Sequence, residues 1–438
     1  MERVEKMAGY SVTAKADMRC YPNYSLEIGD VDGDGRMEVA TLSRSGNRLR
    51  VVNLDGEVLL ERRLNNHGNW GTAPIAITDL DGDGREEIVV PDLGPRLEAR
   101  IVAFNCDGQQ VAEHGFGIHA IKDDYGMAVP LLAPMRLRPD GPRGLVAAAA
   151  GGVVIALDPE LNELWRADGF RNDFGHEFCV NDVNADWLDE VAFCTCDHIN
   201  AEPVPGWNTG EFVILDAAGR TMLRRRVEDY CLDTHFDDVA MGDFRGLGQA
   251  EIVLEKGFLI DLNGEVLWDV SDQFDHGQWI AHAPDPRGAG RLIFISELWG
   301  TEGKSALLDG RGETLAQLRD LPSTVLDASI LPGWEVVPTR CHVVQWTPDS
   351  EPEIFVAEQV VCPAGHESSR TVSCQLKAFF LDLKGTLLGA VPFADAQTEG
   401  YFYNGEVHSR VADVDGDGRP EILFPRQDGK AMLIAKRM

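Results

Sequence analysis

A short acidic loop recurs along this chain and limits the folds that it can adopt. Residues 30–38 read DVDGDGRME and lead directly into an apolar run at 39–42, and residues 79–87 and 413–421 repeat the pattern. Residues 182–190 are a close variant with Asn184 at the third position. Oxygen donors at positions 1, 3, 5 and 9, with glycines that permit positive φ, suit a hard cation with six or more oxygen ligands. We therefore predict calcium (Ca2+) loops.

The spacing of the acids separates these loops from EF-hands. An EF-hand places its bidentate acid at position 12 and continues as a helix, whereas here the acid is at position 9 and a β-type run follows. A polar turn without a metal is the alternative interpretation, and the repetition argues against it. The predicted metal ligands are Asp30, Asp32, Asp34 and Glu38; Asp79, Asp81, Asp83 and Glu87; Asp182, Asn184, Asp186 and Glu190; and Asp413, Asp415, Asp417 and Glu421.

Each loop belongs to a larger unit that ends in a hairpin. In the first unit, Asp55-Gly56 separates two apolar runs, which is a strong hairpin signal, and comparable turns recur along the chain. Residues 243–251 and 345–353 are degenerate copies of the loop that keep its spacing from position 1 to position 9. Residues 134–145 and 285–292 stand where two further loops of the repeat are expected. The units are roughly 40–70 residues long, which is near the length of propeller repeats. We predict an all-β fold with a single β-propeller domain over residues 1–438, eight blades being preferred and seven possible.

The two ends of the chain complement each other. The last unit stops after the strand-like run 430–435 and lacks its outermost strand, whereas residues 10–15 precede the first unit and alternate like a strand. Pairing between them would close the ring and remove open sheet edges. We predict that the N-terminal strand completes the last blade.

Composition limits the kinds of binding partner and the cellular compartment that we expect. The formal net charge of −32 argues against a nucleic-acid or anionic-membrane surface, and no apolar run is long enough to span a membrane. The nine cysteines are scattered and odd in number, which suits a reducing compartment. Because residues 1–9 show no hydrophobic leader, we expect a cytoplasmic protein, or a secreted one if a leader has been removed.

The acidic loops resemble a known calcium repeat. Asp-x-Asp-Gly-Asp-Gly-x-x-Glu before an apolar strand is similar to the FG-GAP/VCBS repeat of integrin heads and many bacterial propellers. This resemblance implies the propeller fold and calcium. It says little about activity, because propellers have many functions.

A narrower resemblance comes from the runs before the loops. Residues 275–280 (DHGQWI), 235–244 (HFDDVAMGDF) and 406–413 (EVHSRVAD) are similar to the histidine-bearing inner strands of propeller polysaccharide lyases, namely rhamnogalacturonan and rhamnosyl-glucuronate lyases. The resemblance implies calcium-dependent β-elimination at a uronic acid. The expected partner is a uronate-containing oligo- or polysaccharide that contains rhamnose.

Histidines gather at one position of the repeat. Seven of the eleven lie shortly before a loop slot, in the run expected to form the innermost strand or the turn leading into it. Inner strands of a propeller surround its axis, so these side chains could converge, although each taken alone could be an ordinary packed residue. Histidine titrates near neutral pH and can serve as base and as acid. The candidate catalytic residues are His67, His119, His176, His235 and His276, and the candidate substrate-binding residues are Tyr125, Arg171, Trp279, Tyr403, His408 and Arg410.

Three functions remain open at this point. The lyase would use histidine or tyrosine as acid and base, with arginine or calcium neutralising the carboxylate as charge develops on it. A non-catalytic calcium propeller that binds a protein or a glycan would need no titratable cluster near its axis. A histidine-ligated metal enzyme on the same ring is the third.

Overall fold

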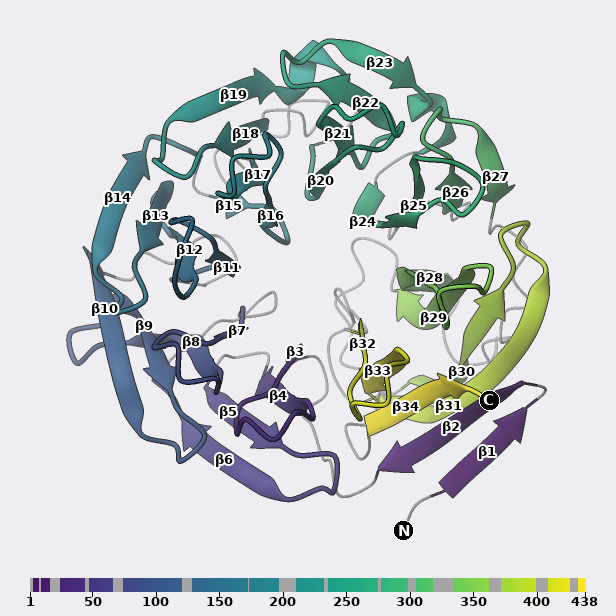
Figure 1. Ribbon diagram of the computed structural model, residues 1–438, viewed down its shortest axis with the longest axis horizontal. Coiled ribbons are helices and arrows are strands. Elements are labelled where there is room, and N and C mark those ends of the chain that lie inside the picture. Colours follow the sequence, from purple (N-terminus) through teal and green to yellow (C-terminus); the bar gives the residue numbers. More distant parts are fainter. Residues whose placement is uncertain are drawn as a thin grey trace.

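The structure confirms an all-β, eight-bladed β-propeller (Figure 1). The computed structural model describes residues 3–7, 9–15, 24–43, 47–65, 74–119, 128–171, 173–196, 210–231, 235–274, 277–297, 305–317, 335–361, 372–398, 409–425 and 432–438. Within these ranges, helix is limited to the 3-10 turns Val227–Asp229 and Ser271–Gln273. The described part therefore contains no candidate transmembrane helix.

Each blade is an antiparallel sheet that runs from an inner to an outer strand, and we number the blades 1 to 8 in chain order from β3. The inner strands are β3 (Tyr24–Gly29), β7 (Ala76–Thr78), β11 (Leu131–Met135), β15 (Asp173–Phe174) with β16 (Cys179–Asn181), β20 (Val239–Gly242), β24 (Gly277–Pro284), β28 (Glu335–Val344) and β32 (Arg410–Ala412). The second strands are β4 (Glu38–Ser43), β8 (Glu87–Leu93), β12 (Gly144–Ala149), β17 (Glu190–Cys196), β21 (Glu251–Leu254), β25 (Arg291–Glu297), β29 (Glu353–Val361) and β33 (Glu421–Pro425).

The outer half of each blade follows the same order. The third strands are β5 (Arg48–Val52), β9 (Glu98–Phe104), β13 (Val153–Leu157), β18 (Glu211–Leu215), β22 (Phe258–Asp261), β26 (Ala306–Leu308), β30 (Val372–Leu381) and β34 (Met432–Arg437). The outer strands of blades 1 to 7 are β6 (Val58–Arg63), β10 (Gln110–His119), β14 (Glu163–Asp168), β19 (Thr221–Arg226), β23 (Val266–Asp269), β27 (Thr314–Gln317) and β31 (Leu387–Thr398).

Blade 8 is completed by the other end of the chain, as the sequence predicts. β2 (Tyr10–Lys15) pairs antiparallel with β34, from Tyr10 opposite Arg437 to Lys15 opposite Met432. β1 (Arg3–Met7) adds a fifth strand outside β2, which the sequence analysis did not predict. In Figure 1, β2 accordingly runs alongside β34, with β1 outside it.

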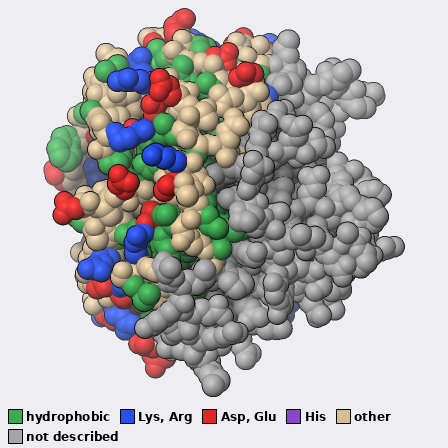
Figure 2. All heavy atoms as spheres, turned by 90° about the vertical axis from the view of Figure 1, so that its right-hand side faces the viewer, with side chains coloured by type: hydrophobic (Ala, Val, Ile, Leu, Met, Phe, Trp, Pro, Cys, Tyr) green, Lys and Arg blue, Asp and Glu red, His purple; other side chains and the backbone are tan. Residues whose placement is uncertain are grey.

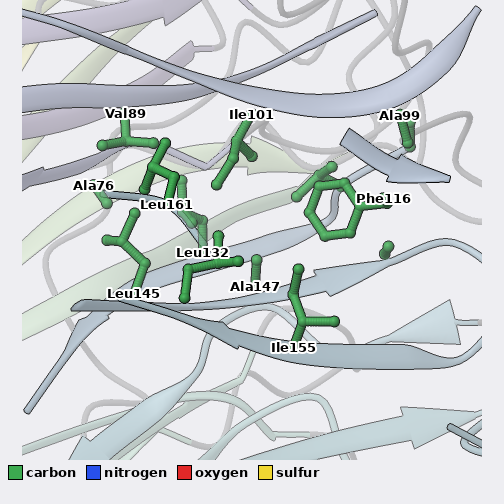
Figure 3. Packing of buried hydrophobic residues seen from close by; sticks show 14 of the residues in the cluster. Ala76, Val89, Ala99, Ile101, Phe116, Leu132, Leu145, Ala147, Ile155 and Leu161 are labelled. Carbon is green, nitrogen blue, oxygen red and sulfur yellow. The ribbon is translucent and has the colours of Figure 1, made fainter. Parts of the chain in front are cut away.

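The hydrophobic core lies between neighbouring blades. Figure 3 shows the cluster between blades 2 and 3, where Ile101 from one blade faces Leu145 and Ile155 from the next. The second and third strands are buried almost continuously, whereas the outer strand β14 shows few buried side chains. Each sheet thus packs on both faces near the axis and meets solvent at its outer edge.

Alternation of strand direction gives the ring two different faces. The C-terminal end of each inner strand leads into an acidic or degenerate loop, and its N-terminal end receives the chain from the preceding blade. Histidines before an inner strand and acids after it therefore belong to opposite faces. In the side view of Figure 2, acidic and basic side chains are interspersed over the described surface.

Candidate functional site

Two cavities lie along the axis, and inner strands line them as the sequence predicts. The first, of about 340 Å³, is bounded by β3, β7, β11 and residues 176–178 of blade 4. The second, of about 370 Å³, is bounded mainly by β24 and β28. Glu177 and Arg410 line both cavities, so the two are neighbouring parts of one axial space.

His176 and His235 share one carboxylate next to the first cavity. Nε2 of His235 lies 3.2 Å from Oδ2 of Asp237, and Nε2 of His176 lies 3.9 Å from the same oxygen. The side chain of His176 is 24% exposed and that of His235 only 8%. The structure thus brings together two of the predicted catalytic histidines, one open to the cavity and one enclosed.

A break in the inner strand of blade 4 positions His176. β15 and β16 both pair with β17, and residues 175–178 lie between them. The backbone N–H of His176 donates to the carbonyl oxygen of Asp237 at 2.8 Å. A Cβ at Gly175 would lie 2.2 Å from that carbonyl oxygen, so only glycine permits this approach of the two blades.

A buried carboxylate holds the segment that carries His235 and Asp237. Glu255, in the turn after β21, is fully buried and accepts backbone N–H groups from Asp237 at 2.9 Å and Asp238 at 2.7 Å. Asp238 in turn accepts the N–H of Ile280 in blade 6 at 2.8 Å. Burial, followed by the charge of Asp237, raises the pKa of Glu255 well above its ordinary value. A proton on Glu255 would relieve the repulsion among these acids.

Trp279 extends this group into the second cavity. Its ring lies 5.8 Å from that of His176, centroid to centroid, and the side chain is buried. Because it also lines the second cavity, Trp279 connects the histidine pair to that space. Trp279, a predicted substrate-binding residue, therefore lies beside His176.

Arg410 is held by an acid from the neighbouring blade. Its Nε and Nη2 donate to the carboxylate of Glu27 in β3 at 3.0 Å, and its Nη1 donates to the carbonyl oxygen of Ser409 at 3.1 Å. Glu177 adds a second acid beside it. Arg410 lies where a positively charged side chain that binds the substrate is expected, but Glu27 and Ser409 already use much of its hydrogen-bonding capacity.

Two further histidines line the second cavity. His282 accepts a hydrogen bond from Nε of Arg291 at 3.0 Å, and Nε2 of His342 lies 2.6 Å from Oγ of Ser409. Burial and the charge of Arg291 lower the pKa of His282 to about 4. A neutral, hydrogen-bonded His282 fits a packing role.

The other predicted site residues are less informative. His67, His276, Tyr125, Tyr403 and His408 lie outside the described residues. The backbone of His119 ends the outer strand β10, and its side chain is outside the description. Arg171 lies in the connection between β14 and β15 and is not among the described residues that line the two cavities. Their roles stay predictions.

Sequence reasoning missed the acids that organise the site. Asp237 and Asp238 follow His235 within the quoted run, but their roles depend on contacts with blades 4 and 6 that no local pattern shows. Glu27 is the one charged residue of the inner strand β3, and that anomaly was the available signal. Its partner Arg410 is 383 positions away.

The acidic loops lie at the opposite end of the inner strands. In three of them the carboxylate oxygens from positions 1, 3 and 9 approach within 4.8 Å of one another: Asp30, Asp32 and Glu38; Asp79, Asp81 and Glu87; and Asp413, Asp415 and Glu421. The position-5 acids Asp34 and Asp83 each accept a backbone N–H at 2.8 Å instead.

The first two loops fit a calcium ion by the chemistry of their donors. Glu38 is buried, and burial together with the charges of Asp32, Asp34 and Asp30 raises its pKa to about 7. A carboxylate in such surroundings gains stability from a cation, and all the donors are the oxygens that calcium prefers. When bound, calcium would supply the opposing charge and connect the inner and second strands.

The loop of blade 4, residues 182–190, keeps positive φ at two positions without glycine. Ala185 (φ 60°) and Trp187 (φ 71°) occupy positions where the first loop has Gly33 (φ 78°) and Gly35 (φ 87°). Nδ2 of Asn184 donates to Glu190 at 2.9 Å, and these side chains are not among the close three-carboxylate groups of the described residues. Asp182, Asn184, Asp186 and Glu190 stay predicted ligands.

Comparisons with known proteins agree with this architecture. The model of the FG-GAP-like repeat family matches residues 30–90, which contain the first two acidic loops. No curated protein matches the chain significantly. Among solved structures, the rhamnogalacturonan lyase YesW matches with a TM-score of 0.56 and 16% identity, covering 100% of this chain and 76% of that one.

Two further structures show the breadth of the similarity. The exotype rhamnogalacturonan lyase YesX has a TM-score of 0.54 at 17% identity, over 100% of this chain and 74% of its own. BamB from Moraxella catarrhalis has a TM-score of 0.53 at 11% identity, over 99% and 100%. At these identities the matches establish the propeller fold and no specific activity.

Proposed function

We propose that this chain is a calcium-dependent lyase that cleaves a uronate-containing oligo- or polysaccharide by β-elimination. The observation that carries the proposal is the pair His176 and His235, which share the carboxylate of Asp237 beside the axial cavity. The sequence resemblance to propeller lyases and the fold of YesW and YesX support it.

The roles follow from exposure. His176 is the more exposed ring and would accept the proton at C5, alpha to the uronate carboxylate. The electron pair left on C5 forms the C4=C5 double bond as the C4–O bond breaks. The departing oxygen takes a proton, for which His235 is our candidate, and Asp237 orients both rings. Arg410, which lines both cavities, would hold the carboxylate or hydroxyl groups, and Arg171, outside the described lining, stays a predicted second ligand.

Each elimination would create one unsaturated uronate, whose ultraviolet absorbance tests the proposal. We expect a rise in absorbance with rhamnogalacturonan or rhamnose–glucuronate oligosaccharides. His176→Ala and His235→Ala should each reduce the rate by about 10²–10⁴-fold with nearly unchanged melting temperatures.

The matched control is His114→Ala in the outer strand β10, where Nδ1 lies 3.1 Å from the carbonyl oxygen of Leu161, remote from the axis. This variant should keep full activity. Absence of product from both substrate classes with wild-type protein, or full activity in both site variants, would contradict the proposal.

One observation favours a non-catalytic calcium propeller that binds a protein or a glycan. Glu27 already neutralises Arg410, and Glu177 adds a second acid to the same space. Among the described lining residues, a uronate would find little free positive charge. Saturable glycan binding without turnover would support this second function.

A further inference from the structure

The acidic loop of blade 8 contains a cation that the protein itself supplies. Nζ of Lys436 lies 3.0 Å from Asp415, 2.5 Å from Asp417 and 2.7 Å from Glu421. Asp415 and Glu421 belong to the close carboxylate group of this loop. An ammonium group with three donors matches three carboxylate partners.

The register of the blades shows that this lysine is an exception. In every blade with a glutamate at loop position 9, the pairing of the second and third strands defines the residue opposite that glutamate. In blade 8 that residue is Lys436. In the other five it is Asn or Asp: Asn53, Asn105, Asp216, Asp261 and Asp382.

Topology explains why blade 8 can depart from this rule. In the other blades the Asn or Asp opens the hairpin to the outer strand, as Asn53 does by accepting N–H groups from Asp55 and Glu57. In blade 8 the outer strand is β2 from the N-terminal region, so no hairpin follows β34. The position is free of the turn requirement and can carry a lysine.

In two other blades an arginine of the chain binds the position-9 glutamate. In blade 5, Arg245 takes the place of an inner ligand, and its Nε binds Glu251. In blade 7, Nη1 of Arg437 binds Glu353, which also accepts the hydroxyl of Tyr10 at 2.6 Å. In blade 1, by contrast, Arg36 turns away to Asp55 at 3.1 Å.

We infer that Lys436 replaces calcium in blade 8, so that the loop at 413–421 binds no calcium although its sequence is that of a calcium loop. The inference rests on the proposed calcium binding of the other loops. Nζ lies within 3.0 Å of Asp415, Asp417 and Glu421, and two of these, Asp415 and Glu421, form the close ligand group together with Asp413, which the lysine does not contact. A calcium ion with ligands at about 2.3–2.6 Å would need the same two carboxylates. Two cations cannot share them.

The charges at this loop balance locally. The ammonium group of Lys436 lies beside the carboxylates of Asp415, Asp417 and Glu421 and supplies positive charge to the loop. Lys436 and Arg437 together would neutralise the blade 7 and blade 8 acids where the two ends of the chain meet.

Counting bound calcium in single and double variants tests the inference. Metal-stripped protein is dialysed against calcium, and the bound ions per chain are measured by elemental analysis. Relative to wild type, Asp32→Asn should lose one calcium, Asp415→Asn should lose none and Lys436→Met should gain one. The double variant K436M/D415N should return to the wild-type count.

Lys384→Met, an exposed lysine of the blade 7 hairpin, is the matched control and should leave the count unchanged. Lys436→Gln replaces Lys436→Met if the latter does not fold by circular dichroism. A loss of one calcium in Asp415→Asn, no gain in the lysine variant, or no calcium in any variant would overturn the inference.

The lyase assay is a separate readout. A chain without lyase activity that gains calcium in Lys436→Met would remove the proposed activity and leave this inference standing. An active lyase in which Lys436→Met gains no calcium would keep the proposed activity and remove this inference.

Discussion

At the scale of single residues, the surroundings of each histidine decide what it can do. His176 faces the axial cavity, whereas His235 is enclosed and lies nearer to Asp237, at 3.2 Å. His282 is different, because it is desolvated beside Arg291 and is expected to stay neutral. A histidine near the axis is thus not sufficient evidence for catalysis, and its carboxylate partner makes the distinction.

Asp237→Asn tests the orienting role of this carboxylate. Asn keeps the size of the side chain and removes the charge that both rings share. We expect kcat to fall roughly 10–100-fold with little change in KM, because orientation during proton transfer is lost rather than substrate binding. Steady-state kinetics would measure this. A change confined to KM, or a large fall in melting temperature, would contradict it.

His282 should make the protein sensitive to acid. Its pKa is about 4 in the folded state, against an ordinary value of 6.5, so the unfolded chain binds the proton more readily between these values. The contribution to stability is complete above pH 6.5 and is lost as the pH falls toward 4, by at most about 3 kcal/mol. Denaturant unfolding at several pH values should show that the free energy of unfolding falls less between pH 6.5 and 4 in His282→Gln than in wild type. An equal fall in both proteins would exclude His282 as the cause.

At the scale of elements, the repeating unit is a strand, an acidic loop and a second strand. Six of the eight blades have a buried glutamate at position 9, and in the acidic loops it accepts the N–H of position 2, as Glu38 does from Val31 at 3.0 Å and Glu87 from Leu80 at 2.9 Å. In these six blades the buried carboxylate at the start of the second strand needs a positive partner. Calcium, arginine or lysine can meet that need in different blades.

Removal of calcium should therefore act on stability first. In Asp32→Asn, calcium should raise the melting temperature less than in wild type, by about 1–3 °C, because one ligand set is incomplete. Differential scanning calorimetry with and without a calcium chelator would show this. Asp140→Asn, an exposed acid of blade 3, is the control. An equal calcium response in wild type and Asp32→Asn would contradict a site in blade 1.

Local elements were predictable from the sequence and contacts between blades were not. The loops and hairpins are encoded by short spacings, so the blades, their number and the strand that closes the ring follow from the printed sequence. Glu255, Lys436 and Glu27 act on residues of other segments, and their partners depend on how whole blades are placed. The fifth strand β1 has no counterpart among the described strands of the other blades, so no repeat could predict it.

At the scale of the whole molecule, closure of the ring joins the two ends of the chain. Tyr10 is buried, stacks on Phe380 of blade 7 with centroids 4.1 Å apart, and binds Glu353. β2 thus fixes blade 8 to blade 7 as well as completing its sheet. β1 lies outside this arrangement, on the edge of the sheet.

Two truncations separate these contributions. Deleting residues 1–8 removes β1 and should lower the melting temperature only slightly. Deleting residues 1–15 also removes β2 and Tyr10, exposes the edge of β34 and should abolish a single cooperative transition. Thermal melts monitored by circular dichroism would compare the two, and equal effects would contradict closure through β2.

The mass of the reaction products tests the central claim most directly. Elimination breaks the C4–O bond without adding water, so the two fragments of a uronate-containing oligosaccharide should sum to the mass of the substrate, and one fragment should carry the unsaturated uronate. We predict this result for wild type, with product formed about 10²–10⁴-fold more slowly by His176→Ala. Fragments that sum to the substrate plus one water would indicate hydrolysis, and intact substrate after prolonged incubation would indicate a binding protein; either result would contradict the proposed lyase.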